Sequence, residues 1–192
     1  MLMRLYNWML RLAEHPHAAY WLFLLAFTES ALFPIPPDIM LLPLCLANRQ
    51  KAFYFGFICL IGSVLGGIGG YAIGYWFFET IGRPILLSYG YENAIADVTA
   101  VYQEFGRWFV FISATTPIPY KVFTIASGAL QLNLFDFIWV SLLGRGLRFM
   151  LVALLLFYFG AKLRNFIEKY LGWLTLIGTI GLIAGFFLIP YL

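Results

Sequence analysis

Charged side chains are scarce in this sequence of 192 residues: Asp, Glu, Lys and Arg make up 11% of it, whereas hydrophobic residues make up 62%. A soluble domain carries about 25% charged residues. The composition therefore excludes an ordinary soluble core and indicates an integral membrane protein of one domain. The formal net charge of +3 is small and the basic residues form no surface stripe, so nucleic acid is not an expected partner.

Residues that form metal centres and active sites are also few. Cys45 and Cys59 lie in apolar segments without ligands at metal-binding spacing, which predicts buried packing residues rather than a metal site or a disulfide. His15 and His17 flank a proline outside the apolar segments. The sequence contains no HExxH zinc motif, no P-loop, and no Ser or Cys with a plausible base. We therefore expect no enzyme activity, no metal and no cofactor.

The segment 28–38 interrupts a long apolar region, 18–47, with two carboxylates and three prolines. The carboxylates are Glu29 and Asp38, and the prolines are Pro34, Pro36 and Pro37. Proline breaks a helix, and a charge at the bilayer centre costs roughly 2.5–3.5 kcal/mol on insertion scales.

One interpretation of this segment is two helices joined at the membrane surface. The other is a re-entrant hairpin with both acids facing a wet cavity. The apolar runs on either side are about ten residues, or about 15 Å of helix, half of a ~30 Å core, which favours the hairpin.

The same pattern recurs in residues 107–131, where a short apolar run is broken by Pro117-Ile118-Pro119 and then resumes. Lys121 takes the position that Asp38 holds in the first copy. A long apolar helix follows each hairpin, at 52–78 and at 137–161. The sequence thus predicts an all-α polytopic membrane protein: an inverted repeat of two re-entrant helical hairpins, each followed by a transmembrane helix, plus a C-terminal transmembrane helix.

The remaining elements are predicted from shorter patterns. Residues 1–17 form an amphipathic interfacial helix, and residues 91–106 form a second interfacial helix that ends at Gly106. The transmembrane domain covers residues 18–161, and a C-terminal transmembrane helix covers residues 171–190.

Glycines recur every four residues in the first long helix, at Gly62, Gly66, Gly70 and Gly74. Such a ladder reduces one helix face to bare backbone and allows another helix to approach closely. It can serve helix packing within the chain, a homodimer interface, or a surface along a substrate path.

Basic residues outside the apolar runs predict the orientation. With both hairpins re-entrant, one side of the membrane holds Arg4, Arg11, Arg49, Lys51, Lys162, Arg164 and Lys169, and the other side holds Arg83 and Arg107. Because positive residues are enriched in the cytoplasm, this predicts a cytoplasmic N-terminus and an external C-terminus.

Five ionisable residues lie within the predicted membrane domain: Glu29, Asp38, Lys121, Arg145 and Arg148. Arg145 and Arg148 are three positions apart and share a helix face. Acids and bases could simply neutralise one another and hold the hairpins together. However, the set has one excess positive charge, and the arginine fork suits phosphate. Inverted hairpins that meet at the midplane are also the general plan of alternating-access transporters.

Several motifs in order resemble the DedA family, which carries the VTT (SNARE-associated) domain, and in particular its YqaA-like branch. The resemblance covers residues 18–161 and rests on Phe27-Thr28-Glu29-Ser30, Pro36-Pro37-Asp38, the segment from Thr116 to Phe123, Leu143-Gly144-Arg145 and Arg148-Phe149. It implies two inverted re-entrant hairpins in a bacterial cytoplasmic (inner) membrane protein.

The resemblance also implies a lipid-handling role. Eukaryotic members scramble phospholipids, and bacterial members are linked to moving undecaprenyl phosphate or phosphatidylethanolamine with dependence on the proton motive force. At matching positions it implies proton coupling at Glu29 and Asp38, and phosphate binding at Lys121, Arg145 and Arg148. The acids are closer together here than in better-studied members, and Lys121 stands where the family usually has arginine.

We therefore predict a flippase-like or scramblase-like transporter of a phosphate-bearing lipid, with membrane lipids and protons as partners. Two alternatives belong to other classes. The first is a non-transporting membrane organiser whose buried charges are structural, and the second is a small ion channel or exporter.

Overall fold

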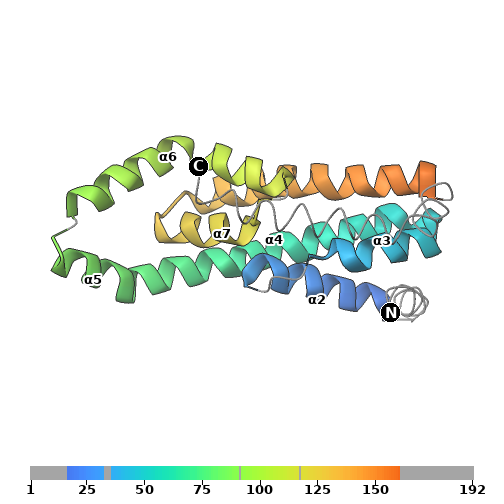
Figure 1. Cartoon of the computed structure of the whole chain (residues 1–192), viewed down its shortest axis with the longest axis horizontal. Helices are drawn as coiled ribbons and strands as arrows, with labels where there is room; N and C mark the ends of the chain where they lie inside the picture. The colour runs from blue at the N-terminus through green and yellow to red at the C-terminus, as the bar shows by residue number, and fades with distance from the viewer. Residues whose placement is uncertain (1–16, 33–35, 91, 117, 161–192) are drawn as a thin grey trace, which may run out of the picture.

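A computed structural model describes residues 17–32, 36–90, 92–116 and 118–160 (Figure 1). Within these ranges the chain forms helices joined by short turns and has no strand, which confirms the all-α prediction. The predicted N-terminal helix over 1–17, the C-terminal helix over 171–190, and the prolines Pro34 and Pro117 lie outside the described residues.

The first predicted hairpin consists of two short helices, α2 (Ala18–Ala31) and α3 (Asp38–Ala47). Their lengths of 14 and 10 residues correspond to about 21 Å and about 15 Å. The break between them follows from the prolines, because a residue before proline is disfavoured in helical conformation. Pro37 is the N-cap of α3, where its missing N–H removes no helix hydrogen bond. Neither helix alone is long enough for a ~30 Å apolar core.

Two helices in the described part of the chain are long and apolar enough to cross a membrane, Arg49–Ser88 and Leu134–Gly160. The first comprises a 3-10 turn η1 (Arg49–Lys51), α4 (Ala52–Phe77), a π-helical turn η2 (Phe78–Gly82) and α5 (Arg83–Ser88). The α-helix α4 agrees with the predicted helix over 52–78 to within one residue, but the helical chain continues beyond it to Ser88 through the π turn and α5. In a regular α-helix the ring of Pro84 would clash with the carbonyl four residues earlier. The π turn ends at Gly82, two residues before Pro84, and the wider turn lets the chain continue as a helix.

The chain then forms α6 (Glu92–Thr115) and α7 (Tyr120–Ala129). Because α6 runs through Gly106, the prediction that an interfacial helix ends there is wrong. Gly106 is buried, and a Cβ there would lie 2.8 Å from the ring of Tyr102 and 3.2 Å from Leu132. The glycine permits close packing in the middle of a helix rather than ending it.

The Arg49–Ser88 helix runs the length of the molecule, and the Leu134–Gly160 helix lies alongside its first part (Figure 1). They are antiparallel, since Gly56 of α4 contacts Ala153 whereas Gly67 contacts Phe137. The pair α2–α3 occupies one half of the molecule, and α7 occupies the other half beside the end of α6 (Figure 1). The breaks of the two hairpins therefore meet near the middle, where the hydroxyl of Thr124 in α7 donates to the Ser30 carbonyl at the end of α2.

The glycine ladder of α4 supports both hairpins. Gly62 and Gly66 face α2, and Gly70 and Gly74 face α7. A Cβ at Gly66 would overlap the carbonyl oxygen of Phe27, and a Cβ at Gly74 would overlap that of Ile125. Backbone thus packs directly on backbone, as small residues allow in membrane helices. This surface of the ladder is occupied within the chain itself.

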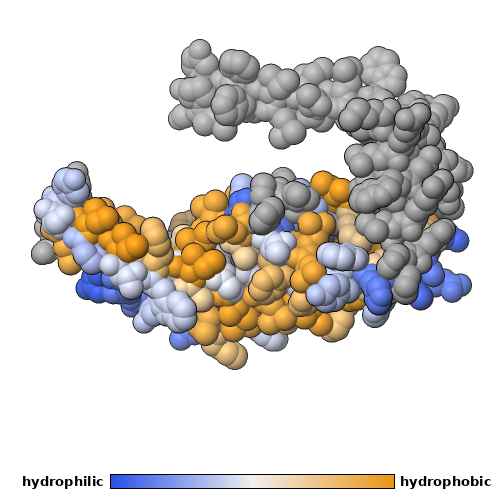
Figure 2. Space-filling view, turned by 90° about the horizontal axis from the view of Figure 1, so that it is seen from below, coloured by the Kyte–Doolittle hydropathy of each residue, from blue (hydrophilic) through white to orange (hydrophobic). Residues whose placement is uncertain are grey.

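Two buried clusters stabilise the two halves. The cluster around α2, α3 and α4 includes Leu22, Leu41, Cys59 and Phe149, and the cluster around α6 and α7 includes Tyr102, Val110, Tyr120 and Phe137. The outer surface also remains apolar: hydrophobic residues cover the centre of the face seen in Figure 2, and hydrophilic residues lie toward its ends. A belt of this kind suits contact with lipid.

Candidate functional site

A buried ion pair joins the first hairpin to the Leu134–Gly160 helix. Nη2 of Arg145 lies 2.6 Å from Oε2 of Glu29 and donates a hydrogen bond to Ser30 Oγ at 3.0 Å. The Ser30 hydroxyl lies 2.7 Å from that of Ser63 in α4, so three helices share one polar network. The side chain of Arg145 is 3% exposed and that of Glu29 is 16% exposed.

Aromatic rings cover the faces of the same guanidinium. Its central carbon lies 4.3 Å from the ring centroid of Tyr120 and 5.4 Å from that of Phe149, distances typical of cation–π contacts. In the described residues, Nε of Arg145 and the Tyr120 hydroxyl are buried without a hydrogen-bond partner. The guanidinium is therefore held by one carboxylate, one hydroxyl and two rings.

A second ion pair links the two hairpin breaks. Nη2 of Arg148 lies 2.6 Å from Oδ2 of Asp38, at the start of α3, and its Nη1 donates to the Thr116 carbonyl after α6 at 2.9 Å. One side chain therefore contacts both hairpins. Both partners of this pair are 24% exposed, so it is more open than the pair formed by Arg145.

Lys121 on α7 is partly exposed and forms no ion pair with any described residue. It lines a pocket of about 540 Å³ that the two ion pairs also line. The structure thus brings together all five ionisable residues singled out from the sequence, and Pro36, Pro37 and Pro119 belong to the same wall. Because each arginine faces one carboxylate, Lys121 carries the excess positive charge.

Several polar partners in this site were not predicted from the sequence: Ser30, Ser63, Tyr120 and the Thr116 carbonyl. A signal exists for Ser63, which lies three positions before Gly66 and therefore on the ladder face of α4. For Tyr120 the sequence offers only its position beside Lys121.

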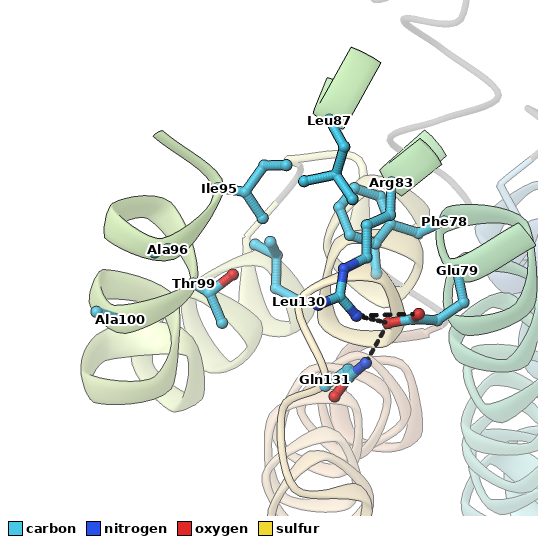
Figure 3. Close-up of a pocket in the computed structure, with 11 residues that line it drawn as sticks. Phe78, Glu79, Arg83, Leu87, Ile95, Ala96, Thr99, Ala100, Leu130 and Gln131 are labelled. Atoms are coloured by element: carbon cyan, nitrogen blue, oxygen red, sulfur yellow. Dashed lines mark hydrogen bonds and ion pairs between the residues drawn. The ribbon is translucent and has the colours of Figure 1, made fainter. Parts of the chain in front are cut away.

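A separate pocket of about 700 Å³ lies between α5, the first half of α6 and the end of α7 (Figure 3). Its polar side is formed by Arg83, 3.3 Å from Glu79, and by Gln131, which donates to the same carboxylate. The Arg83 side chain is 52% exposed, and an ion pair of this kind contributes only about 0–1 kcal/mol. None of the five predicted ionisable residues lines this pocket.

Comparison with known proteins gives a family match and two relatives. A family model described as the VTT domain matches residues 35–162. An uncharacterized protein of Haemophilus influenzae is 37% identical over 188 residues, covering 96% of each chain. An uncharacterized homolog in Histophilus somni is 36% identical over 180 residues, covering 92% of this chain and 93% of its own. No solved structure matches the chain significantly.

Proposed function

The chain belongs to the VTT-domain (DedA) family of membrane proteins, and we propose that it moves a phosphate-bearing lipid between the leaflets of a bacterial cytoplasmic membrane. The proposed substrates are lipids such as undecaprenyl phosphate or phosphatidylethanolamine. The N-terminus is proposed to lie in the cytoplasm.

The single observation that carries this proposal is the pocket between the hairpin breaks. Its volume of about 540 Å³ falls within the range of about 300–1,000 Å³ usual for small-molecule sites, which is enough for a headgroup. The five ionisable residues on its wall sum to one positive charge, since Lys121 has no carboxylate partner among the described residues. A lipid phosphate is an anion, and lysine and arginine are its usual protein partners.

The arrangement of the hairpins supports a path across the membrane. With α4 spanning the bilayer, the half-length helices α2 and α3 reach inward from one side and the second hairpin from the other. The charged pocket then lies near the midplane, as the sites of inverted-repeat transporters do. Both hairpins pack on bare backbone of α4, and movement of one hairpin break against the other would expose the pocket to alternate sides.

Proton exchange at Asp38 provides the proposed coupling, because its pair with Arg148 is the more exposed of the two. Glu29 holds Arg145 and Asp38 holds Arg148, each at 2.6 Å. A protonated carboxyl group no longer attracts the guanidinium electrostatically. Proton binding would therefore release positive charge toward a phosphate, and proton release would favour its departure.

A second candidate function, a non-transporting membrane organiser, is favoured by one observation. Both arginines are already paired, and Arg145 is almost completely buried, as in a purely structural cross-link. This alternative predicts that Glu29→Asp and Lys121→Arg are tolerated and that the purified protein moves no lipid.

Lipid movement in liposomes tests the proposal. Purified protein is reconstituted with a fluorescent phosphatidylethanolamine, and in parallel with a fluorescent polyprenyl phosphate, and a quencher reaches only the outer leaflet. We expect wild type to move at least one probe, and Lys121→Ala and Arg145→Ala to lose this activity. A pH gradient should change the wild-type rate.

Arg83→Ala is the matched control, because Arg83 is an exposed base outside the pocket. Thermal unfolding and size-exclusion profiles establish that each variant is folded. A folded wild type that moves neither probe above the rate of empty liposomes would contradict the proposal and favour the organiser.

A further inference from the structure

We propose that the two arginine–carboxylate pairs have different roles within the function proposed above, on which this inference rests. Arg148 and Lys121 bind the headgroup phosphate, and the phosphate displaces Asp38 from Arg148. Arg145 and Glu29 instead form a fixed cross-link between α2 and the Leu134–Gly160 helix and do not exchange.

Exposure separates the two pairs. Arg145 and Glu29 are 3% and 16% exposed, whereas Arg148 and Asp38 are both 24% exposed. A ligand can replace a carboxylate only where the guanidinium is open to the cavity. Removing the partner of a nearly buried arginine also leaves an uncompensated charge, which is strongly unfavourable.

The number of contacts separates them further. Arg145 is held by Glu29, by the hydroxyl of Ser30 and by the rings of Tyr120 and Phe149, which come from both hairpins and its own helix. Arg148 is held by one carboxylate and one neutral carbonyl. When Asp38 leaves, Arg148 keeps the hydrogen bond from Nη1 to the Thr116 carbonyl and stays in position. Its Nη2 is then free to bind the phosphate.

Lys121 provides the second cation. It lines the same pocket as Arg148 and has no acidic partner among the described residues, so it is available without breaking any ion pair. A phosphate between Lys121 and Arg148 gains two charge-assisted contacts and displaces only Asp38. Asp38 is therefore the intramolecular competitor of the lipid headgroup.

The exchange has a mechanical consequence. Arg148 contacts Asp38 in the first hairpin and the carbonyl of Thr116 in the second, so it connects the two hairpin breaks. Replacement of Asp38 by phosphate breaks the contact between Arg148 and the first hairpin, while the buried Arg145–Glu29 pair keeps α2 in place. Headgroup binding thereby favours movement of α3 rather than of the whole hairpin.

Equilibrium binding tests this assignment independently of transport. The purified full-length protein in dodecyl maltoside is titrated at fixed salt with dihexanoyl phosphatidic acid, and in a parallel arm with inorganic phosphate, and the Kd is measured by calorimetry. We expect Lys121→Ala and Arg148→Ala each to raise the Kd for the lipid by about tenfold or more, the effect of losing one charge-assisted contact. Asp38→Asn should lower it by several-fold, because the competitor loses its charge.

Arg83→Ala is the matched control, because Arg83 does not line the pocket, and it should leave the Kd within about twofold of wild type, a change below about 0.4 kcal/mol. Arg145→Lys and Glu29→Gln should lower the unfolding temperature and raise the Kd less than Arg148→Ala does. If Glu29→Gln does not fold, the Kd of Arg145→Lys alone is compared with that of Arg148→Ala. The inference is overturned if Arg145→Lys raises the Kd as much as Arg148→Ala, or if Asp38→Asn binds no more tightly than wild type.

Two other outcomes separate this inference from the proposed function. The expected Kd pattern without lipid movement in liposomes would support the site and contradict transport. Lipid movement with an unchanged Kd in Lys121→Ala and Arg148→Ala would support transport and contradict the site. Binding of inorganic phosphate without binding of the lipid would overturn the assignment to a headgroup.

Discussion

Arg145 and Glu29 are 116 positions apart in the sequence, yet Nη2 of one lies 2.6 Å from Oε2 of the other. The same helix reaches the first hairpin again through Arg148 and Asp38, which are 110 positions apart. The first hairpin is therefore connected by charge to the helix that follows the second. This cross-connection makes the two halves of the molecule one polar site.

The buried pair should contribute more to stability than the open one. Glu29→Ala leaves Arg145, 3% exposed, without its carboxylate, and we expect the free energy of unfolding to fall by about 3–5 kcal/mol. Asp38→Ala should cost clearly less, because its partner is reached by solvent. Chemical unfolding of both variants in detergent measures the difference, and equal losses would contradict it.

The glycine ladder should not tolerate added methyl groups, whereas a glycine of α4 outside the ladder should. A Cβ at Gly66 or Gly74 overlaps a backbone carbonyl of α2 or α7, so we expect an alanine there to cost about 1–3 kcal/mol or more. Gly69→Ala is the control, since its nearest neighbour would be Phe27 Cζ at 4.0 Å. Unfolding temperatures of the three variants test this, and a loss at Gly69 equal to the others would contradict it.

The ring of Tyr120 should matter more than its hydroxyl. The ring lies 4.3 Å from the guanidinium carbon of Arg145, and the buried hydroxyl has no hydrogen-bond partner among the described residues. Tyr120→Phe should therefore keep or raise stability, whereas Tyr120→Leu loses a desolvated cation–π contact of about 2 kcal/mol. Thermal unfolding of the two variants distinguishes ring from hydroxyl, and a larger loss with Phe than with Leu would refute this.

Re-entry of the first hairpin can be tested by labelling single cysteines in right-side-out and in inverted membrane vesicles. A re-entrant hairpin places its two ends on one side of the membrane and the end of α5 on the other. An impermeant maleimide should therefore label His17→Cys and Asn48→Cys from the same side, and Tyr89→Cys from the opposite side. The native Cys45 and Cys59 are buried and should not react. Labelling of Asn48→Cys and His17→Cys from opposite sides would show that the hairpin crosses.

Local sequence patterns determined the class of protein and the parts of its site. Scarce charge and long apolar runs indicate membrane helices, and prolines mark the helix breaks, because these effects act within a few residues. The five ionisable residues stood out for the same reason: each lies in a segment where charge is costly. Local signals were less reliable for helix ends. The glycine at position 106 predicts a helix end, but α6 continues through it, and the glycine instead allows close packing against Tyr102. The first long helix also continues past Pro84, because a π turn precedes this proline.

Only the tertiary structure decided which charges pair and how deeply each pair is buried. Nothing in the local sequence distinguishes Glu29 from Asp38 as the partner of Arg145, or shows that Tyr120 covers its guanidinium. These contacts depend on how α2, α7 and the Leu134–Gly160 helix pack around the glycine face of α4. Chain composition thus determined that this protein places acids and bases within a membrane domain. Long-range packing determined that Lys121 has no carboxylate partner among the described residues, because the two arginines pair with Glu29 and Asp38.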